Sequence, residues 1–254
     1  MTTFKNLVEL TSLVEQADNI VALTGAGLST AAGIPDFRGP EGLYVTRRYD
    51  PDKTFNIRGF ERDPSDFYRF AADFIDLLAR IRPTFAHSFL AHLEDAGKLS
   101  AVITQNIDML HQVAGSSKVI ELHGSFSSAT CRACGKDYTG LDVPWWQQAL
   151  AANSDTPMAV CPSCGDVIKP DIVFYGELVE NYEEAESVVK GCDLLLVLGT
   201  SLTVTPAAYL PKATTAPVIA VSQGEVELSP AKSYHIVNAD LDEFCRKMAG
   251  GLKL

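Results

Sequence analysis

Long apolar runs are missing from this 254-residue sequence. No run reaches the roughly 18 residues that a membrane-spanning helix needs. The first ten residues carry a glutamate and several polar side chains where a secretion signal would need an apolar segment. We therefore expect a cytoplasmic protein that does not associate with membranes.

Positive charge is also scarce. The chain has 21 Lys and Arg against 32 Asp and Glu, which gives a formal net charge of −11. Non-specific binding to nucleic acid or to anionic lipid depends on cationic side chains, so neither is expected as a partner. A negatively charged protein instead suits a partner with basic residues.

Helical and strand-like segments alternate along the chain, as they do in parallel α/β proteins. Apolar residues at helical spacing predict helices at 4–14, 67–78, 85–96 and 241–248, with Asp63 as N-cap and Pro64 as first residue of the second. Strand-like runs lie at 19–24, 101–103, 118–122, 193–198 and 217–221. Residues 193–198 show no alternation, which predicts a strand buried on both faces of a parallel sheet.

The stretch from Gly124 to Pro170 breaks this rhythm, because its apolar periodicity fades and four cysteines appear. We interpret it as a small module inserted into a doubly wound domain. The predicted fold class is α/β, with a Rossmann-like parallel sheet and a smaller inserted zinc-binding module.

Two C-x-x-C pairs supply the metal ligands of this module: Cys131, Cys134, Cys161 and Cys164. Four thiolates in two close pairs suit tetrahedral Zn²⁺ and leave no open coordination position, so the metal is expected to be structural. Its expected task is to hold a segment too small to have a core of its own. Redox thiols are one alternative. A nucleic-acid-binding zinc ribbon is another, but the module has three Lys and Arg against four Asp and Glu.

A glycine-rich run follows the first strand. Gly25 and Gly27 would let the backbone approach a pyrophosphate, and Ser29 and Thr30 would supply donors at a helix start. The third glycine of G-x-G-x-x-G is absent, so a plain tight turn is an alternative. The next residues, 33–39, place an acid, an aromatic ring and a cation in a loop that could act as a lid.

Two further strand ends carry polar side chains. Residues 104–108 end a strand with amides and a carboxylate that match a nucleoside-like ligand, although Asn106 or Asp108 could simply cap a helix. His123 precedes a glycine at a second strand end and is a candidate proton carrier. The other four histidines are expected to be structural: His87, His92, His111 and His235.

Taken together, these runs resemble the sirtuin family of NAD-dependent protein-lysine deacylases. They occur in the family's order, and the length is similar to that of a bare catalytic core of bacterial type. The matching runs are residues 25–39, 104–111, 121–124, the four cysteines, 169–177 and 198–201.

The resemblance implies one sirtuin-type catalytic domain in two parts. The large Rossmann-like part would comprise about residues 1–36, 80–123 and 171–254. The small part would comprise about residues 37–79 and 124–170, including the zinc module.

The resemblance also implies NAD-dependent removal of acetyl groups from protein lysines, with nicotinamide and O-acetyl-ADP-ribose as products. Asn106 would place a neutral dipole beside the cleaved bond, and Asp108 would accept from the nicotinamide carboxamide. The acyl oxygen would attack the anomeric carbon, after which His123 would act as general base on a ribose hydroxyl. Phe37 would exclude water from the intermediate, and Arg38 would lie near the phosphates.

The residues that the resemblance assigns to NAD are Gly25, Ala26, Thr30, Asp36, Phe37, Arg38, Gln105, Asn106, Ile107, Asp108, His123, Gly199, Thr200, Ser201, Ser222 and Asp240. The family usually has asparagine where Ser222 stands. The shorter serine predicts a weaker or water-mediated contact with the adenosine ribose.

The acyl-lysine substrate is assigned to Val173, Phe174 and Gly176, whose backbone would pair with an extended peptide. Tyr68 is assigned to the acyl pocket. Family members that prefer succinyl-lysine carry Tyr-x-x-Arg, whereas Ala71 stands three residues after Tyr68 here. We therefore expect neutral acyl groups, acetyl first, on proteins or peptides with basic flanks.

Two other functions remain compatible with these residues. The same activated intermediate could support mono-ADP-ribosyl transfer if another nucleophile reached it. A non-catalytic module that binds acyl-lysine or an NAD metabolite is the second alternative. His123 beside an intact Gln105–Asp108 run argues against this binder, which has no need of a base.

Overall fold

Six parallel strands form the larger of two sheets in the computed structural model, which describes residues 7–35, 49–152, 156–227 and 233–252. The strands are β1 (Ile20–Thr24), β2 (Leu99–Thr104), β3 (Val119–Glu121), β7 (Leu194–Leu198), β8 (Val218–Ser222) and β9 (Tyr234–Asn238). Their order is β3-β2-β1-β7-β8-β9, with every neighbouring pair parallel. Every residue of β7 is buried, which confirms the strand predicted for residues 193–198.

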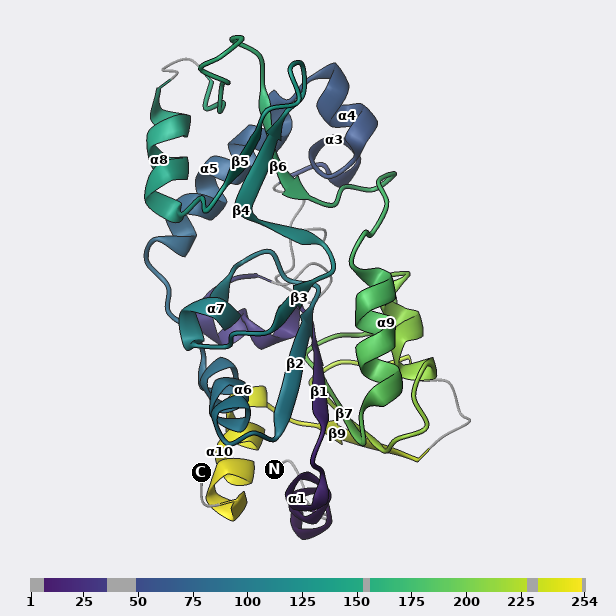
Figure 1. Ribbon diagram of the computed structural model, residues 1–254. Helices are drawn as coiled ribbons and strands as arrows, with labels where there is room; N and C mark the ends of the chain where they lie inside the picture. Colours follow the sequence, from purple (N-terminus) through teal and green to yellow (C-terminus); the bar gives the residue numbers. More distant parts are fainter. Residues whose placement is uncertain (1–6, 36–48, 153–155, 228–232, 253–254) are drawn as a thin grey trace.

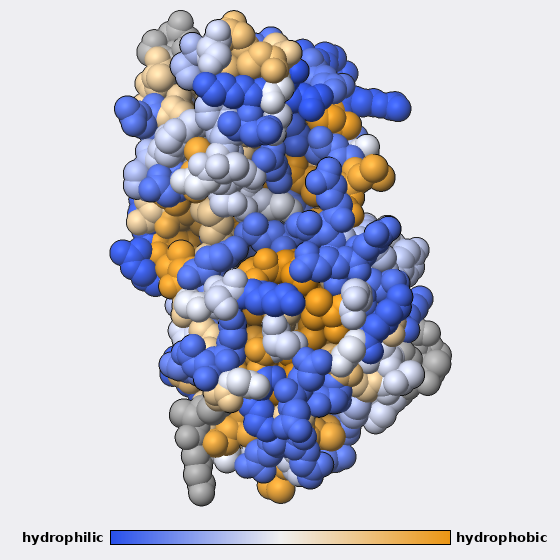
Figure 2. Space-filling model, in the orientation of Figure 1, coloured by the Kyte–Doolittle hydropathy of each residue, from blue (hydrophilic) through white to orange (hydrophobic). Residues whose placement is uncertain are grey.

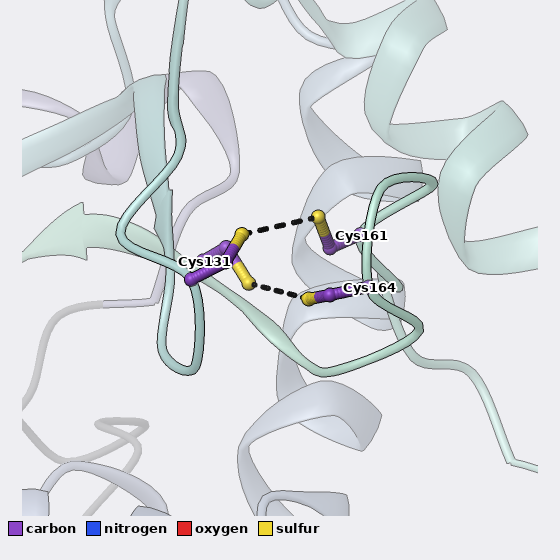
Figure 3. A group of neighbouring side chains, drawn as sticks. Cys131, Cys161 and Cys164 are labelled. Atoms are coloured by element: carbon purple, nitrogen blue, oxygen red, sulfur yellow. Dashed lines mark hydrogen bonds between the residues drawn. The ribbon is translucent and has the colours of Figure 1, made fainter.

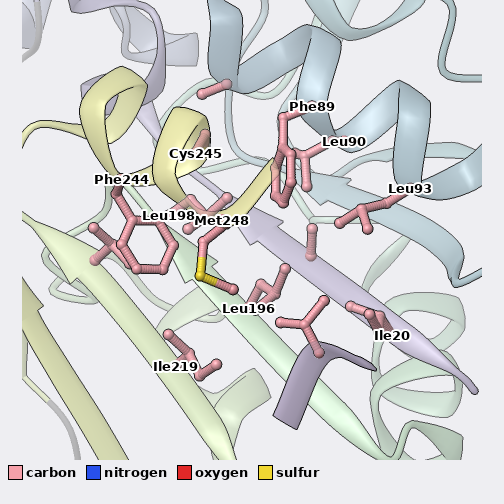
Figure 4. Packing of buried hydrophobic residues seen from close by; sticks show 14 of the residues in the cluster. Ile20, Phe89, Leu90, Leu93, Leu196, Leu198, Ile219, Phe244, Cys245 and Met248 are labelled. Carbon is pink, nitrogen blue, oxygen red and sulfur yellow. The ribbon is translucent and has the colours of Figure 1, made fainter. Parts of the chain in front are cut away.

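Helices cover both faces of this sheet (Figure 1). Apolar side chains of α1 (Leu7–Gln16), α6 (Phe85–Asp95) and α10 (Leu241–Leu252) pack on one face. Figure 4 shows Phe89 and Leu90 of α6, Phe244 and Met248 of α10 and Leu196 of β7 meeting there. The helix α9 (Tyr182–Gly191) and the 3-10 helix η3 (Ala207–Lys212) cover the other face. This arrangement confirms the predicted Rossmann-like α/β class.

A second, antiparallel sheet lies beside the first, at the top of Figure 1. It contains β4 (Gly124–Cys131), β5 (Asp137–Thr139) and β6 (Ile168–Ile172) in the order β5-β4-β6. The helices α3 (Pro51–Thr54), α4 (Ile57–Arg62), α5 (Ser65–Leu78) and α8 (Val143–Ala151) surround it. We call these elements the small part of the molecule.

The small part has an apolar core, to which the cysteine segment contributes together with other elements. Phe126 of β4 is fully buried and contacts Phe67 and Phe74 of α5 as well as the fully buried Trp146 of α8. The inserted segment and the helix α5 therefore share one core. The sequence of the insert did not reveal it, because the apolar partners come from residues about 60 positions earlier.

Two local predictions were wrong in detail. The helix predicted to begin at Pro64 begins at Ser65, and Asp63 accepts a hydrogen bond from the Ser65 nitrogen at 3.0 Å. The glycine-rich run does not open a long helix. It forms two single turns of 3-10 helix, η1 (Ala26–Leu28) and η2 (Thr30–Ala32).

The short helix α7 (Leu110–Ala114) follows β2. Among the described residues, no helix is both long and apolar enough to cross a membrane. The chain runs from β3 directly into β4, so the two sheets are joined at residues 122 and 123. This junction matters for the site, because His123 lies in it.

Candidate active site

The candidate site lies where the connections of the large sheet change direction. After β1 the chain forms β2 and then β3 on one side of β1. It later returns to form β7, β8 and β9 on the other side of β1. Ligands of such sheets bind at this switch point, beyond the carboxyl ends of the strands. The loops that follow β1, β2 and β7 all line the cleft found there.

Three glycines let the loops after β1 and β7 approach each other. The Gly25 nitrogen donates to the Leu198 carbonyl at 3.0 Å, and the Gly27 nitrogen donates to the Gly199 carbonyl at 2.9 Å. Gly199 has φ of 67°, and a Cβ placed there would overlap the Leu28 nitrogen. A side chain at this position would therefore force the two loops apart.

The cleft has a volume of about 850 Å³, which is within the usual range for ligand sites. Figure 2 shows a mostly hydrophilic face interrupted by hydrophobic patches, several of them near the junction of the two parts. The predicted NAD residues that line the cleft are Gly25, Ala26, Thr30, Gln105, Asn106, Ile107, Asp108, His123, Gly199, Thr200, Ser201, Ser222 and Asp240. The remaining three, Asp36, Phe37 and Arg38, lie outside the described residues.

A buried network joins the loops after β1 and β2. The Ser29 hydroxyl, which the sequence suggests as a pyrophosphate donor, here donates to Asp108 Oδ2 at 2.6 Å. Asp108 Oδ1 accepts from the Leu110 nitrogen at 2.9 Å. The Asn106 amide donates to the Gly25 carbonyl and to Ser29 Oγ, each at 3.2 Å. These bonds fix both Asn106 and Asp108 at the cleft wall.

The environment of Asp108 alters its acidity. Burial raises the pKa of the Asp108 carboxyl, while hydrogen bonds from Ser29 and Leu110 lower it in part. An unpaired oxygen in this buried position would be costly, so the Ser29 and Leu110 donors hold the carboxyl in place.

His123 has one ring nitrogen fixed and the other free. Its Nδ1 lies 2.8 Å from the Gln105 carbonyl oxygen, which can only accept, so Nδ1 carries the proton. Among the described residues, none hydrogen-bonds to Nε2. Burial lowers the pKa of His123, and the Gln105 carbonyl raises it in part. At neutral pH the ring is therefore uncharged, with Nε2 able to accept a proton.

Two cleft residues at the β8 and β9 ends are already engaged. Ser222 Oγ accepts from the Gly224 nitrogen at 3.1 Å. Asp240 Oδ1 accepts from the Glu243 nitrogen at 2.9 Å and thereby caps α10. The Ser222 hydroxyl shapes the turn after β8, which is consistent with the weaker ribose contact expected for serine.

The predicted peptide residues follow β6 and line the cleft opposite the glycine loops. The Val173 nitrogen donates to the His123 carbonyl at 2.9 Å. The Tyr175 nitrogen donates to the Phe55 carbonyl at 2.8 Å. Gly176 has φ of 98°, which turns the chain there. The segment is thus anchored to the histidine on one side and to the small part on the other.

The structure contradicts the assignment of Tyr68 to the acyl pocket. Its side chain is fully buried within the small part, and its hydroxyl donates to the Ile168 carbonyl. Neither Tyr68 nor the equally buried Ala71 lines the cleft. The i, i+3 spacing placed both on one face of α5 correctly, but that face points into the core.

Several lining residues were missed by the sequence reasoning. Phe55, Phe70 and Phe74 form an apolar wall, and Glu225 and Asp242 add carboxylates. The phenylalanines of α5 had been recognised only as a core face. No sequence signal distinguishes a cleft wall from a core, because both are apolar.

The four cysteines of the two C-x-x-C pairs converge as predicted. Their sulfur atoms all lie within 4.8 Å of one another, and Figure 3 shows those of Cys131, Cys161 and Cys164 turned toward a common centre. Cys131 Sγ lies 3.4 Å from Cys164 Sγ. Four soft donors at this spacing fit one structural Zn²⁺. The cluster is not among the residues that line the cleft.

Two of the histidines expected to be structural lie in the interior. His87 and His111 have ring centroids 4.7 Å apart, and His111 Nε2 lies 3.0 Å from Thr24 Oγ1. Burial lowers the pKa of His87 to about 4 and that of His111 to about 3. Both rings are therefore neutral, and neither lines the cleft.

Comparison with known proteins identifies the family. The model of the Sir2 family matches residues 25–206. The chain belongs to the Sir2 family. A relative from Thermotoga maritima, an NAD-dependent protein deacetylase, is 42% identical over 94% of this chain and 96% of its own. NAD-dependent protein deacetylase 1 from Pyrobaculum aerophilum is 44% identical over 82% of this chain and 79% of its own.

Solved Sir2 structures have the same fold. One, from work on the structural basis for the mechanism and regulation of Sir2 enzymes, has a TM-score of 0.87 at 34% identity. The match covers 99% of this chain and 99% of that one. Another, described as holding a deacetylated p53 peptide and 3′-O-acetyl ADP-ribose, has a TM-score of 0.86 at 40% identity and covers 96% of this chain and 98% of its own. Both matches extend over nearly the whole of this chain, so the fold described above is the Sir2 fold.

Proposed function

We propose that this protein removes acetyl groups from lysine side chains of proteins, with NAD as co-substrate and nicotinamide and O-acetyl-ADP-ribose as products. Relatives of similar length named as NAD-dependent protein deacetylases support this function. So do Sir2 structures described with a p53 peptide and NAD⁺ or with acetyl ADP-ribose. The observation that carries this function is the position of His123. Its Nδ1 bonds to the Gln105 carbonyl of the loop after β2, its own carbonyl accepts from Val173 of the peptide segment, and its Nε2 is left to accept a proton.

His123 acts as the general base. The fixed proton on Nδ1 leaves Nε2 to accept a proton from a ribose hydroxyl, and the neutral ring at pH 7 is ready to do so. The Gln105 carbonyl then stabilises the charged ring, because it accepts from Nδ1 in both protonation states. His123 is thus held in one tautomer by the backbone of a residue that itself lines the cleft.

NAD supplies an activated ribose carbon from which nicotinamide can leave. Asn106 presents a neutral dipole there, and Asp108 can accept from the carboxamide of the leaving group. The bond from Ser29 keeps Asp108 oriented, and the burial of Asn106 and Asp108 strengthens each interaction. The glycine loops after β1 and β7 allow the phosphates to approach the backbone.

The peptide binds along residues 173–176. Among the described residues, the Val173 carbonyl and both backbone groups of Gly176 have no hydrogen-bond partner. These groups can pair with an extended peptide, a mode that depends little on side chains. The same segment touches His123, which brings the modified lysine to the base.

We expect the cleft to prefer neutral acyl groups, acetyl first, and peptides with basic flanks. The described lining residues include no lysine or arginine, but they include five acidic residues: Asp108, Glu177, Glu225, Asp240 and Asp242. A negatively charged acyl group would meet an apolar wall and like charges. We also propose a cytoplasmic location, because none of the six cysteines, all of them described, forms a disulfide.

An assay of nicotinamide release from NAD with an acetylated and an unacetylated peptide tests the function. We expect release only when both NAD and the acetylated peptide are present. In His123→Ala we expect loss of steady-state release, with at most one nicotinamide per active site, because the base acts after nicotinamide has left. Mass spectrometry of labelled NAD products separates deacetylation, which yields O-acetyl-ADP-ribose, from ADP-ribosyl transfer to protein. Peptide binding without turnover would leave only a binding module and would refute the proposal.

A further inference from the structure

A buried lysine stands out in the small part of the molecule. Lys169, in β6, is 6% exposed and is the only lysine or arginine among the buried residues that the structure describes. An isolated ammonium group in such a position is expensive, so it persists only where its protons are satisfied. Lys169 forms no hydrogen bond or ion pair with His123 or with the described residues of the loops after β1, β2 and β7, so its role must lie elsewhere.

The three protons of Lys169 are all engaged. Its Nζ donates to the Ile172 carbonyl at 2.7 Å and to the Pro170 carbonyl at 3.3 Å. It also forms an ion pair with Glu177 Oε2 at 3.0 Å. The ammonium lies 4.2 Å from the ring centroid of Phe174, which adds a cation–π contact. All these partners belong to the eight residues that follow the lysine.

Glu177 closes the other end of the same segment. Its Oε2 accepts from the Phe174 nitrogen at 2.8 Å, and its own nitrogen donates to the Phe174 carbonyl at 3.0 Å. The Lys169 side chain therefore fixes the start of the segment at Ile172 and, through Glu177, its end. Gly176, with its positive φ, supplies the turn that brings Glu177 back.

The segment held in this way is the peptide-binding segment. Residues 172–178 all line the cleft, and in Figure 1 they form the green chain that leaves β6 and crosses toward α9. The hydrogen bond from Val173 to the His123 carbonyl ties the segment to the base. A shift of the segment would therefore disturb the groups that pair with the peptide backbone.

We propose that the Lys169–Glu177 ion pair is a positioning device that sets the peptide-binding segment against His123, an inference that rests on the proposed function. Neither residue is a catalytic residue, because each acts through the backbone of residues 172–176. The pair gives the segment the shape that an incoming peptide strand needs before the peptide arrives. Its contribution is thus to peptide affinity rather than to NAD binding or to the proton transfer.

The test uses the full-length zinc-loaded protein and the variants Lys169→Met and Glu177→Gln. We expect the KM for a long acetyl-peptide to rise about tenfold, which corresponds to about 1.4 kcal/mol. The KM for NAD and the kcat at saturating peptide should stay within about twofold. Lys190→Met is the matched control, because Lys190 forms an exposed ion pair with Glu186 in α9 and should change nothing.

Peptide length provides a second readout that a merely structural role would not move. In the wild-type protein, a long acetyl-peptide should bind more tightly than a blocked acetyl-lysine that has no flanking backbone. In both variants this advantage should shrink, while the short substrate is affected little. Glu177→Gln keeps an acceptor for the Phe174 nitrogen, so it remains informative if Lys169→Met does not fold.

Several outcomes would overturn the inference. One is an unchanged peptide KM with a lowered melting temperature, and another is an equal rise in the KM values for peptide and NAD. If the wild-type protein shows no turnover, the proposed function fails. The affinity of wild type and variants for a labelled acetyl-peptide, measured by fluorescence anisotropy, then tests the role of the ion pair separately. Equal peptide affinity in wild type and variants, or no affinity in either, would refute the positioning role.

Discussion

At the scale of single residues, one hydrogen bond determines the chemistry of the base. The Gln105 carbonyl can accept from His123 Nδ1 but cannot donate to it, so the backbone after β2 selects the tautomer. Burial keeps the ring neutral by lowering its pKa. A histidine without that carbonyl would present either nitrogen to the cleft, and only one of the two tautomers could act as base.

The lowered pKa of His123 predicts the pH dependence of the reaction. The neutral ring is the active form, and it is protonated as the pH falls through a pKa below the ordinary value of 6.5. We expect kcat/KM to be constant from about pH 8 down to the ordinary histidine pKa of about 6.5 and to fall only below it. His123→Ala should lower the rate about 10²- to 10⁴-fold, and the remaining rate should no longer fall at acidic pH. NAD binding measured across the same range controls for unfolding, and a limb centred above 6.5 would contradict the assignment.

Gly199 offers a second residue-scale prediction. We expect Gly199→Ala to lose about 1–3 kcal/mol of unfolding free energy from its positive φ alone. The overlap with the Leu28 backbone should also weaken NAD binding, because the loops after β1 and β7 must separate. Gly250→Ala in α10 is the control, because its Cβ would meet nothing within 4 Å. Unchanged NAD affinity by calorimetry would show that the close approach of these loops is not needed.

At the scale of elements, the cysteine cluster and the aromatic core stabilise the small part together. The metal joins the loop after β4 to the loop before β6, and these two strands pair directly. The core joins β4 and α8 to α5. The cluster is therefore expected to act on the site through β6, which leads into the peptide segment, and through β4, which begins at Gly124 beside His123.

Removing the metal tests this arrangement. The purified protein should contain one zinc per chain by elemental analysis, and Cys161→Ser should contain much less. Losing about 3 kcal/mol or more of stabilisation would lower the melting temperature by roughly 6–12 °C. Cys192→Ala, a buried cysteine outside the cluster, should retain the zinc. Full activity in metal-free protein of normal stability would show that the cluster has no structural role.

At the scale of the whole molecule, charge is the property that bears on function. The chain carries a net charge of −11, and the described lining of the cleft contains five of its acidic residues and no basic one. The field at the peptide site is therefore negative on average. Such a field attracts cationic peptides and is screened by salt.

Peptide charge and salt should accordingly change the rate together. We expect kcat/KM to be higher for an acetyl-peptide with lysine or arginine flanks than for one with acidic flanks. The difference should shrink as salt rises from about 0.05 to 0.5 M, where the Debye length falls to a few ångströms. A peptide with neutral flanks, whose rate should hardly depend on salt, is the control. A preference for acidic flanks would refute this part of the proposal.

Some features of the fold and the site could be predicted from the sequence, and others could not. The strand at 193–198 was predictable because burial on both faces leaves no polar positions, and the zinc site because thiolate spacing is chemically restrictive. The domain boundaries near residues 36, 79, 123 and 170 stay predictions. Tyr68 was misplaced because helical spacing says which residues share a face but not what that face meets.

The sequence alone indicated five of the six strands of the large sheet, the metal ligands and the candidate base, because periodicity and ligand spacing are local properties of the chain. Only the tertiary structure decided which apolar residues line the cleft rather than the core. It alone also showed the tautomer of His123 and the partners of Lys169. The physical reason is that these features depend on distances between segments far apart in sequence, or on how a loop folds back on itself, and no local pattern encodes such distances.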